Sequence, residues 1–174
     1  YTLVTALRPD HHGIAHNSMK DAELGRFVVA DKDAGRVPGW WQGLPLWTSA
    51  ERAGIATGVW AWPGVSAPRD GLLPRYWHEF DADIPLDARI DQVAGWLEAT
   101  GGPRPGLVAL YLENVDRAGH DHGPGAPGTR TAIRAADAAI GRLLARIGSA
   151  GLAPVTNVVV VSDHGMAEVP PGHY

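Results

Sequence analysis

Two short runs of branched apolar residues, separated by a long helical pattern, constrain the fold of this chain most strongly. Residues 107–112 read LVALYL and residues 157–161 read NVVVV, and each run is bounded by Gly, Pro or polar residues. Such runs are typical of strands buried on both faces of a parallel sheet. Between them, residues 129–151 repeat apolar side chains at helical spacing, with Thr129 or Thr131 as the expected N-terminal cap. The strand–helix–strand order predicts a right-handed βαβ unit.

Three further segments extend this pattern. Residues 55–62 (IATGVWAW) predict another strand, and residues 1–7 predict the start of a helix that Pro9 ends. Residues 87–99 predict a helix whose inner face carries Ile90, Val93, Ala94 and Leu97. Alternating strands and helices predict an α/β fold with a largely parallel sheet sandwiched by helices.

The length of 174 residues suits one domain, so we expect residues 1–174 to form a single, partial domain. The chain starts with Tyr1 rather than Met and stops at Tyr174, the last residue of an expected PPGHY loop. We interpret it as an internal piece of a longer protein, truncated at both ends.

Charge and composition exclude several classes of partner. The formal net charge of −4 gives no electrostatic footprint for a nucleic-acid duplex or an anionic membrane surface. No apolar run approaches the roughly 20 residues that a membrane span requires. The chain has no cysteine, so disulfides and thiolate metal sites are excluded, and any metal must be held by oxygen and imidazole ligands.

Acid and imidazole follow both strong strand candidates. Asp116 and His120 come after the first, four residues apart on an expected loop, and the adjacent pair Asp163 and His164 comes after the second. In open α/β sheets, ligand groups gather where strands reach their carboxyl ends. Carboxylate oxygen and imidazole nitrogen both bind Zn²⁺ at about 2.0–2.2 Å. The spacing therefore indicates a metal site.

The alternative is structural, because a lone Asp or His at a strand end is usually a cap, a turn former or a solvated group. His11, His12, His78 and His173 belong to this class on spacing alone. For the two Asp–His pairs, spacing alone leaves both a metal site and two polar loops open.

Five segments of the chain resemble a known family. YLENVDRAGHDHGP and VVVVSDHGM are similar to the two metal-binding motifs of the type I phosphodiesterase/nucleotide pyrophosphatase family, within the alkaline phosphatase superfamily. YTLVTALRPDHHGIAHNSM resembles the segment that follows the nucleophile of that family, and LPLWTSAERAG and WAWPG resemble its next two signatures. The segments appear in family order and span nearly the whole chain.

The resemblance implies a site with two Zn²⁺ ions bridged by the substrate phosphate, with other divalent ions as alternatives. Asp116 and His120 would be ligands of one ion, and Asp163 and His164 ligands of the other. Asn17 matches an asparagine whose amide donates to a phosphate oxygen.

The same resemblance places one aromatic side chain at the substrate, because Tyr111 matches a residue that lines the leaving-group pocket. Phe80 or Trp77 would help to stack a nucleobase, an assignment that no motif of the family fixes. For Phe80 and Trp77, plain core packing is the alternative.

The implied reaction is in-line attack on a nucleotide phosphodiester or pyrophosphate by a Thr or Ser, followed by hydrolysis of the phosphoryl-enzyme ester. The family's nucleophile and one metal-binding Asp precede the position of Tyr1, and a last metal-binding His follows Tyr174. Thr2 and Thr5 fall inside the helix that follows the nucleophile. We therefore expect the nucleophile outside this chain, and the chain alone to be inactive.

Two other functions remain open. One is another hydrolase of the superfamily, such as a phosphomonoesterase, phosphonate hydrolase or sulfatase, and the other is a catalytically inert fragment. The Ala-, Gly- and Arg-rich composition indicates a bacterial source. The family resemblance then implies export, either to the periplasm or out of the cell.

Overall fold

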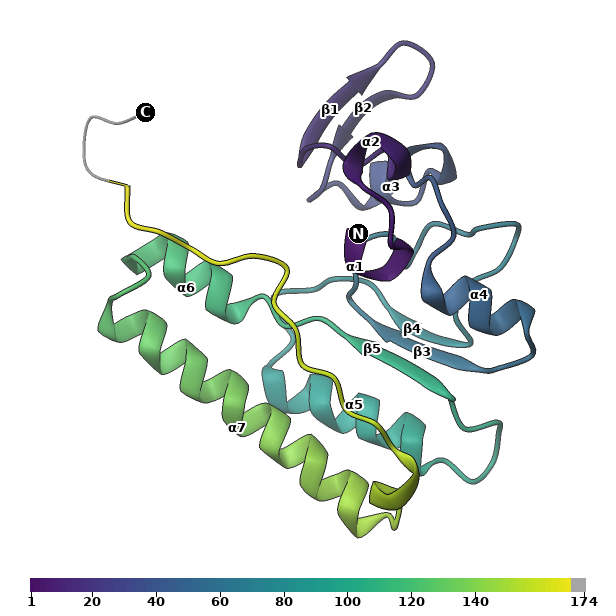
Figure 1. The fold of residues 1–174 in the computed structure, drawn as a ribbon, viewed down its shortest axis with the longest axis vertical. Helices are drawn as coiled ribbons and strands as arrows, with labels where there is room; N and C mark the ends of the chain where they lie inside the picture. Colours follow the sequence, from purple (N-terminus) through teal and green to yellow (C-terminus); the bar gives the residue numbers. More distant parts are fainter. Residues whose placement is uncertain (170–174) are drawn as a thin grey trace. The chain divides into compact units, whose positions relative to one another are not determined.

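A parallel sheet of three strands organises the first part of the chain in a computed structural model that describes residues 1–169. The sheet has the order β4-β3-β5, formed by β3 (Thr57–Trp60), β4 (Tyr76–His78) and β5 (Leu107–Leu110) (Figure 1). Central β3 is parallel to both neighbours, with Val59 opposite Trp77 on one side and Ala109 on the other. All four residues of β3 are buried, so two hydrogen-bonded neighbours and two covered faces stabilise this strand.

The chain divides into two units. The first contains Tyr1–Asp83 and Trp96–Tyr111, and the second contains Ile84–Gly95 and the chain from Leu112 onward. Helix α5 (Leu86–Glu98) begins in the second unit and ends in the first.

Aromatic side chains form the core of the first unit. Phe27, Trp40 and Trp41 pack in one buried cluster, and Trp47 packs with Val59 in another. These clusters hold several short elements around the sheet: α1 (Thr2–Thr5), α2 (Pro9–His12), the antiparallel pair β1 (Ser18–Asp21) and β2 (Gly25–Val28), α3 (Lys32–Gly35), η1 (Pro38–Trp40) and α4 (Leu46–Arg52).

Helices dominate the second unit. Helix α6 (Asn114–His122) and helix α7 (Pro127–Ser149) pack as a hairpin, and the short η2 (Ala153–Val155) follows. On α5, Asp87 pairs with Arg142 of α7, and Asp91 pairs with Arg146 at 3.0 Å. After η2 the chain runs without helix or strand to residue 169.

The predicted fold class is confirmed, and so are most of the helices and strands that the sequence predicted. The predicted helix at residues 87–99 is α5, with Ile90, Val93 and Ala94 buried, and the strands predicted at 55–62 and 107–112 are β3 and β5. That residues 1–174 form one domain stays a prediction.

The strand predicted at residues 157–161 is wrong. This segment pairs with no strand among residues 1–169, and Val159 and Val160 are 80% and 68% exposed. Branched side chains favour extended backbone, but a strand also needs a neighbour to complete its hydrogen-bond ladder.

Two predicted helix boundaries are also wrong. Helix α7 begins at Pro127, whose fixed φ suits the first helical turn, so neither Thr129 nor Thr131 is its cap. Residues 1–7 form only the short α1, and Pro9 begins α2 instead of ending a helix. No helix within residues 1–169 is long and apolar enough to cross a membrane. His173 lies outside the described residues.

Candidate functional site

Helix α6 carries the first predicted pair of metal ligands. Asp116 lies in its first turn and His120 one turn later, with His120 Nε2 3.6 Å from Asp116 Oδ1. The expected loop is therefore a helix, where positions four apart stand on one face. The helix brings both side chains to one point without any special loop conformation.

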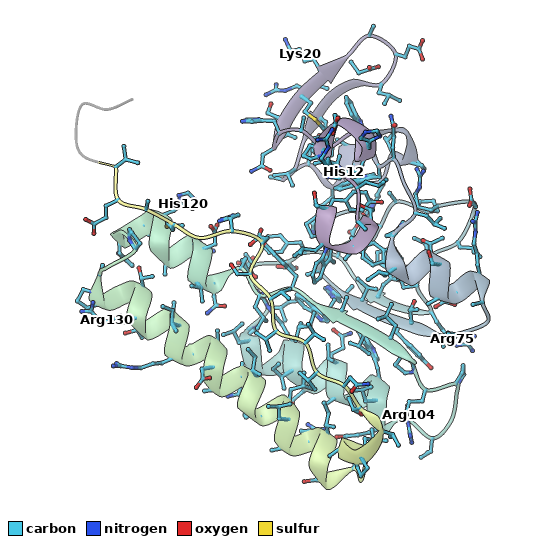
Figure 2. The ribbon with its side chains drawn as sticks, in the orientation of Figure 1. His12, Lys20, Arg75, Arg104, His120 and Arg130 are labelled. Carbon is cyan, nitrogen blue, oxygen red and sulfur yellow. The ribbon has the colours of Figure 1, made fainter. Side chains whose placement is uncertain are left out.

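The second predicted pair lies on the extended segment after η2, beside α6. His164 Nε2 is 3.9 Å from Asp116 Oδ1 and 3.6 Å from Asp163 Oδ2. Figure 2 shows His120 on α6 next to this segment. The segment packs closely on α6 here, since a Cβ atom added at Gly119 would require the flexible end of the Met166 side chain to move.

Asp116 is the centre of this group of four side chains. Its Oδ1 atom is buried and has no hydrogen-bond partner among residues 1–169. A buried carboxylate oxygen without a donor is costly unless a cation or a proton satisfies it. The burial of this oxygen is therefore consistent with a carboxylate that binds a cation.

The separations of the donor atoms also agree with metal binding. Two ligands of one tetrahedral Zn²⁺, each at about 2.1 Å, stand about 3.4 Å apart, close to the 3.6 Å between Asp116 and His120. Across residues 1–169, no set of three or more His, Asp or Glu side chains is arranged to hold one ion.

The pKa of His164 is raised above the ordinary histidine value. The Gly165 carbonyl, which accepts a hydrogen bond from Nδ1 at 2.9 Å, is the main cause, and the carboxylates of Asp163 and then Asp116 add to it. The carbonyl also leaves Nε2, the atom that faces Asp116, as the nitrogen available to a metal ion.

Three aromatic side chains meet at the carboxyl ends of the parallel strands in the first unit. The ring centroid of Tyr111 is 6.5 Å from that of Phe80 and 6.3 Å from that of Trp62, and both contacts are T-shaped. Tyr111 continues the β5 ladder by donating its backbone N–H to Trp60 at 3.1 Å. The structure thus brings together two predicted substrate-binding residues, Tyr111 and Phe80.

Sequence reasoning missed Trp62, although its position two residues after the end of β3, in the quoted WAWPG segment, could have indicated it. Trp77 lies on β4, is 36% exposed and packs against none of these three rings in the described part of the chain. Phe80, at 43% exposure, is the better candidate for stacking.

Asn17 is exposed and directly precedes β1. Its carbonyl accepts the Val29 N–H at 2.9 Å, which extends the β1–β2 ladder, and the Nδ1 atom of His16 accepts the next N–H, from Ser18. These bonds fix the backbone at Asn17, while its side chain faces solvent.

Two of the histidines set aside on spacing make structural contacts. His12 is buried, accepts the Ile14 N–H at Nδ1 and bonds Thr2 Oγ1 through Nε2 at 2.9 Å. Burial lowers its pKa, which favours the neutral imidazole. His78 stacks on Trp60 with ring centroids 5.0 Å apart.

Comparison with known proteins gives a consistent result. The profile of the family described as type I phosphodiesterase / nucleotide pyrophosphatase matches residues 1–174. The venom phosphodiesterase CdcPDE of Crotalus durissus collilineatus is 32% identical over 169 residues, which are 97% of this chain and 20% of the relative. Ectonucleotide pyrophosphatase/phosphodiesterase family member 1 of Mus musculus is 34% identical over 169 residues, 97% of this chain and 18% of the relative.

Among solved structures, an inactive variant of murine ectonucleotide pyrophosphatase / phosphodiesterase 5 in complex with AMP matches with a TM-score of 0.78. The two proteins are 30% identical, and the match covers 87% of this chain and 40% of that one. The chain therefore spans about a fifth of the length of these curated relatives.

Proposed function

Because the chain belongs to the type I phosphodiesterase/nucleotide pyrophosphatase family, we propose that the protein carrying it hydrolyses phosphodiester or pyrophosphate bonds of small nucleotides. The observation that carries the proposal is the convergence of His120 and His164 on the buried Oδ1 atom of Asp116, which accepts no hydrogen bond from residues 1–169. Two motifs far apart in the sequence supply these side chains, and metal-assisted hydrolysis requires such a donor set.

The proposed cofactors are two Zn²⁺ ions, with Asp116 and His120 on one and Asp163 and His164 on the other. Zinc would act as a Lewis acid that neutralises phosphate charge and activates the attacking oxygen. The protein's own contribution is to hold two carboxylates and two imidazoles on a helix and on the segment beside it, with Nε2 of His164 turned toward Asp116.

The proposed substrate is a nucleotide such as ATP or a dinucleotide, cleaved to a nucleoside monophosphate. The structural relative solved with AMP supports a nucleotide, as does the contact between Tyr111 and Phe80. Exposed aromatic rings stack on nucleobases through their faces. Asn17 would donate its amide to an equatorial phosphate oxygen.

The proposed nucleophile is a Thr or Ser that precedes Tyr1 in the whole protein, so this chain alone would bind metal without turnover. The relatives are named as venom and ectonucleotide enzymes, and we place this protein outside the cytoplasm as well, in the periplasm or secreted. A bacterial source stays a prediction; the relatives named above come from animals.

A comparison of substrates by the whole protein tests the function. We expect hydrolysis of a nucleotide 5′-phosphodiester at a higher kcat/KM than hydrolysis of the matching monoester, complete loss with a chelator, and recovery with Zn²⁺. Preference for the monoester, a phosphonate ester or a sulfate ester would instead favour another hydrolase of the superfamily. Absence of turnover of all these substrates by the whole, zinc-loaded protein would support the alternative that the chain is catalytically inert.

A further inference from the structure

A buried ion pair lies at the start of the helix that carries Asp116. Arg89 of α5 is 2% exposed, and its guanidinium donates to Glu113 through Nη1 to Oε2 at 2.5 Å and Nη2 to Oε1 at 3.0 Å. Its Nε donates to the carbonyl of Ile84 at 2.8 Å. All these residues belong to the second unit. A fork-to-fork pair of this kind fixes orientation as well as distance.

Glu113 is the N-cap residue of α6, and its backbone belongs to the same turn as Asp116. Its carbonyl accepts the Arg117 N–H at 3.0 Å, which closes the first turn around Asp116. Glu113, Asp116 and His120 follow one another at i, i+3 and i+7, a spacing that places them along one stripe of a helix. The carboxylate held by Arg89 is therefore the neighbour of Asp116 on that stripe.

Other hydrogen bonds hold α6 against α7. Asn114 donates from Nδ2 to the Ala132 carbonyl at 3.0 Å, and Thr129 Oγ1 bonds the carbonyls of Ala118 and Gly123 at 3.1 and 2.7 Å. These bonds come from a single neighbour, α7. Arg89 supplies a contact from α5, and it hydrogen-bonds the Glu113 side chain, which lies on the same stripe of α6 as Asp116 and His120.

We propose that Arg89 and Glu113 are positioning residues for the metal site, holding the first turn of α6 so that Asp116 presents its Oδ1 atom to the cation. This inference rests on the proposed function, because it assigns a role toward the metal ion bound by Asp116. The His120 side chain is 72% exposed and has little packing of its own, so the orientation of the helix sets where it points.

Charge alone predicts the opposite effect, which makes the proposal testable. Arg89 is a cation near a cation site, so its removal should strengthen metal binding if only Coulomb repulsion mattered. Positioning predicts weaker binding. Arg89→Lys keeps the charge and removes the planar fork, so its effect reports on geometry.

The experiment measures Zn²⁺ affinity by competition with a chromophoric chelator and thermal unfolding of the metal-free protein, in the whole protein. The variants are Arg89→Lys and the double variant Arg89→Met/Glu113→Gln, which removes both charges together and so avoids an unpaired buried carboxylate. Arg142→Gln is the matched control. Arg142 of α7 forms an exposed ion pair with Asp87 of α5, so this variant removes a different ion pair of the helix that carries Arg89. Asp116→Asn serves as the benchmark for loss of a ligand.

We expect both pair variants to bind Zn²⁺ about 10–100-fold more weakly, the range for lost outer-shell partners, while Arg142→Gln stays within about twofold. The double variant should remain weak even where its unfolding temperature equals that of the unmodified protein. Unchanged affinity in both pair variants, or recovery of affinity together with stability in the double variant, would overturn the positioning role. Unchanged affinity in Asp116→Asn would instead overturn the metal site itself.

Discussion

The Nε2 atom of His164 lies 3.9 Å from the Oδ1 atom of Asp116, although the two residues belong to separate motifs. The long helix α7 lies between them in the sequence, and the extended segment after η2 runs back to the side of α6 (Figure 1). The returning segment packs on α6 where Met166, two residues after His164, lies against Gly119. The candidate site therefore joins α6 with the segment that follows the α6–α7 hairpin and η2.

In the whole protein, replacement of Asp116 by Asn should abolish most of the activity. The variant keeps the size and shape of the side chain and removes the charge from the oxygen that lies nearest to both His120 and His164. We expect kcat/KM for a nucleotide diester to fall at least about 100-fold, because loss of a metal ligand exceeds the effect of losing its outer-shell partner. Zinc content and kinetics measured on the same preparation check this.

Asp137→Asn is the matched control, since Asp137 is an exposed carboxylate on α7 and the change in charge is the same. Its activity should equal that of the unmodified protein. Equal activity of both variants would remove Asp116 from the metal site.

Replacement of Phe80 by Ala should weaken binding of the nucleobase. Phe80 contacts Tyr111 and is 43% exposed, so one side of the ring is available to a ligand. Stacking on an aromatic ring is worth about 1–3 kcal/mol per base, which corresponds to a rise in KM of roughly 5- to 150-fold. Kinetics with a thymidine nitrophenyl diester, compared with a methyl nitrophenyl diester that has no base, measure the effect.

Trp77→Ala is the control for this prediction, because Trp77 is similarly exposed but contacts none of the three rings within residues 1–169. We expect it to leave both KM values unchanged. An equal loss for both substrates in Phe80→Ala would indicate a packing role instead of base recognition.

Most of the fold could be predicted from patterns that local physics sets. The helix at residues 87–99 follows from apolar spacing, and β3 and β5 follow from short apolar runs bounded by Gly, Pro or polar residues. The run at 157–161 has the strongest strand composition, yet it is unpaired in the described structure, because pairing depends on a neighbour that a local pattern does not specify.

The site was predictable in its residue types and less so in its geometry. Spacing indicated Asp116 with His120, but a loop was expected where a helix places them. The role of Glu113 could not be read from the sequence, because its partner Arg89 comes from another helix. Long-range contacts of this kind leave no periodic signal in the sequence.

Replacement of Gly64 by Ala should destabilise the first unit. Gly64 has φ +87°, and a Cβ atom there would stand 2.8 Å from Cε3 of Trp41, a buried ring of the core. The backbone penalty of about 1–2 kcal/mol is joined by an overlap penalty of about 1–3 kcal/mol. The free energy of unfolding from urea titration should fall accordingly.

Gly54→Ala separates the two contributions, because Gly54 has a similar φ of +78° but no atom within 4 Å of the added Cβ. We expect only the backbone penalty there. If both variants lost the same stability, the contact with Trp41 would contribute nothing.

The pair between Arg36 and Glu79 should make stability depend on pH in the acid range. Hydrogen bonds from Arg36, with Nη2 2.7 Å from Oε2, are the main cause that lowers the pKa of Glu79 below its ordinary value, and burial opposes them. A carboxyl with a lower pKa in the folded state contributes stability above its unfolded pKa of about 4.3. That contribution is lost as the pH falls through the folded pKa.

Arg36→Gln should therefore reduce the free energy of unfolding at pH 6, and the difference from the unmodified protein should shrink as the pH falls below about 4.3. Arg26→Gln, an exposed β2 position without an ion pair among the described residues, removes the same charge and controls for the change in net charge. Because a general charge effect would act on both variants alike, parallel pH curves for the two would assign the acid sensitivity to net charge. A pH-dependent difference confined to Arg36→Gln would assign it to the Glu79 carboxylate, and urea titrations between pH 3 and 6 decide between the two.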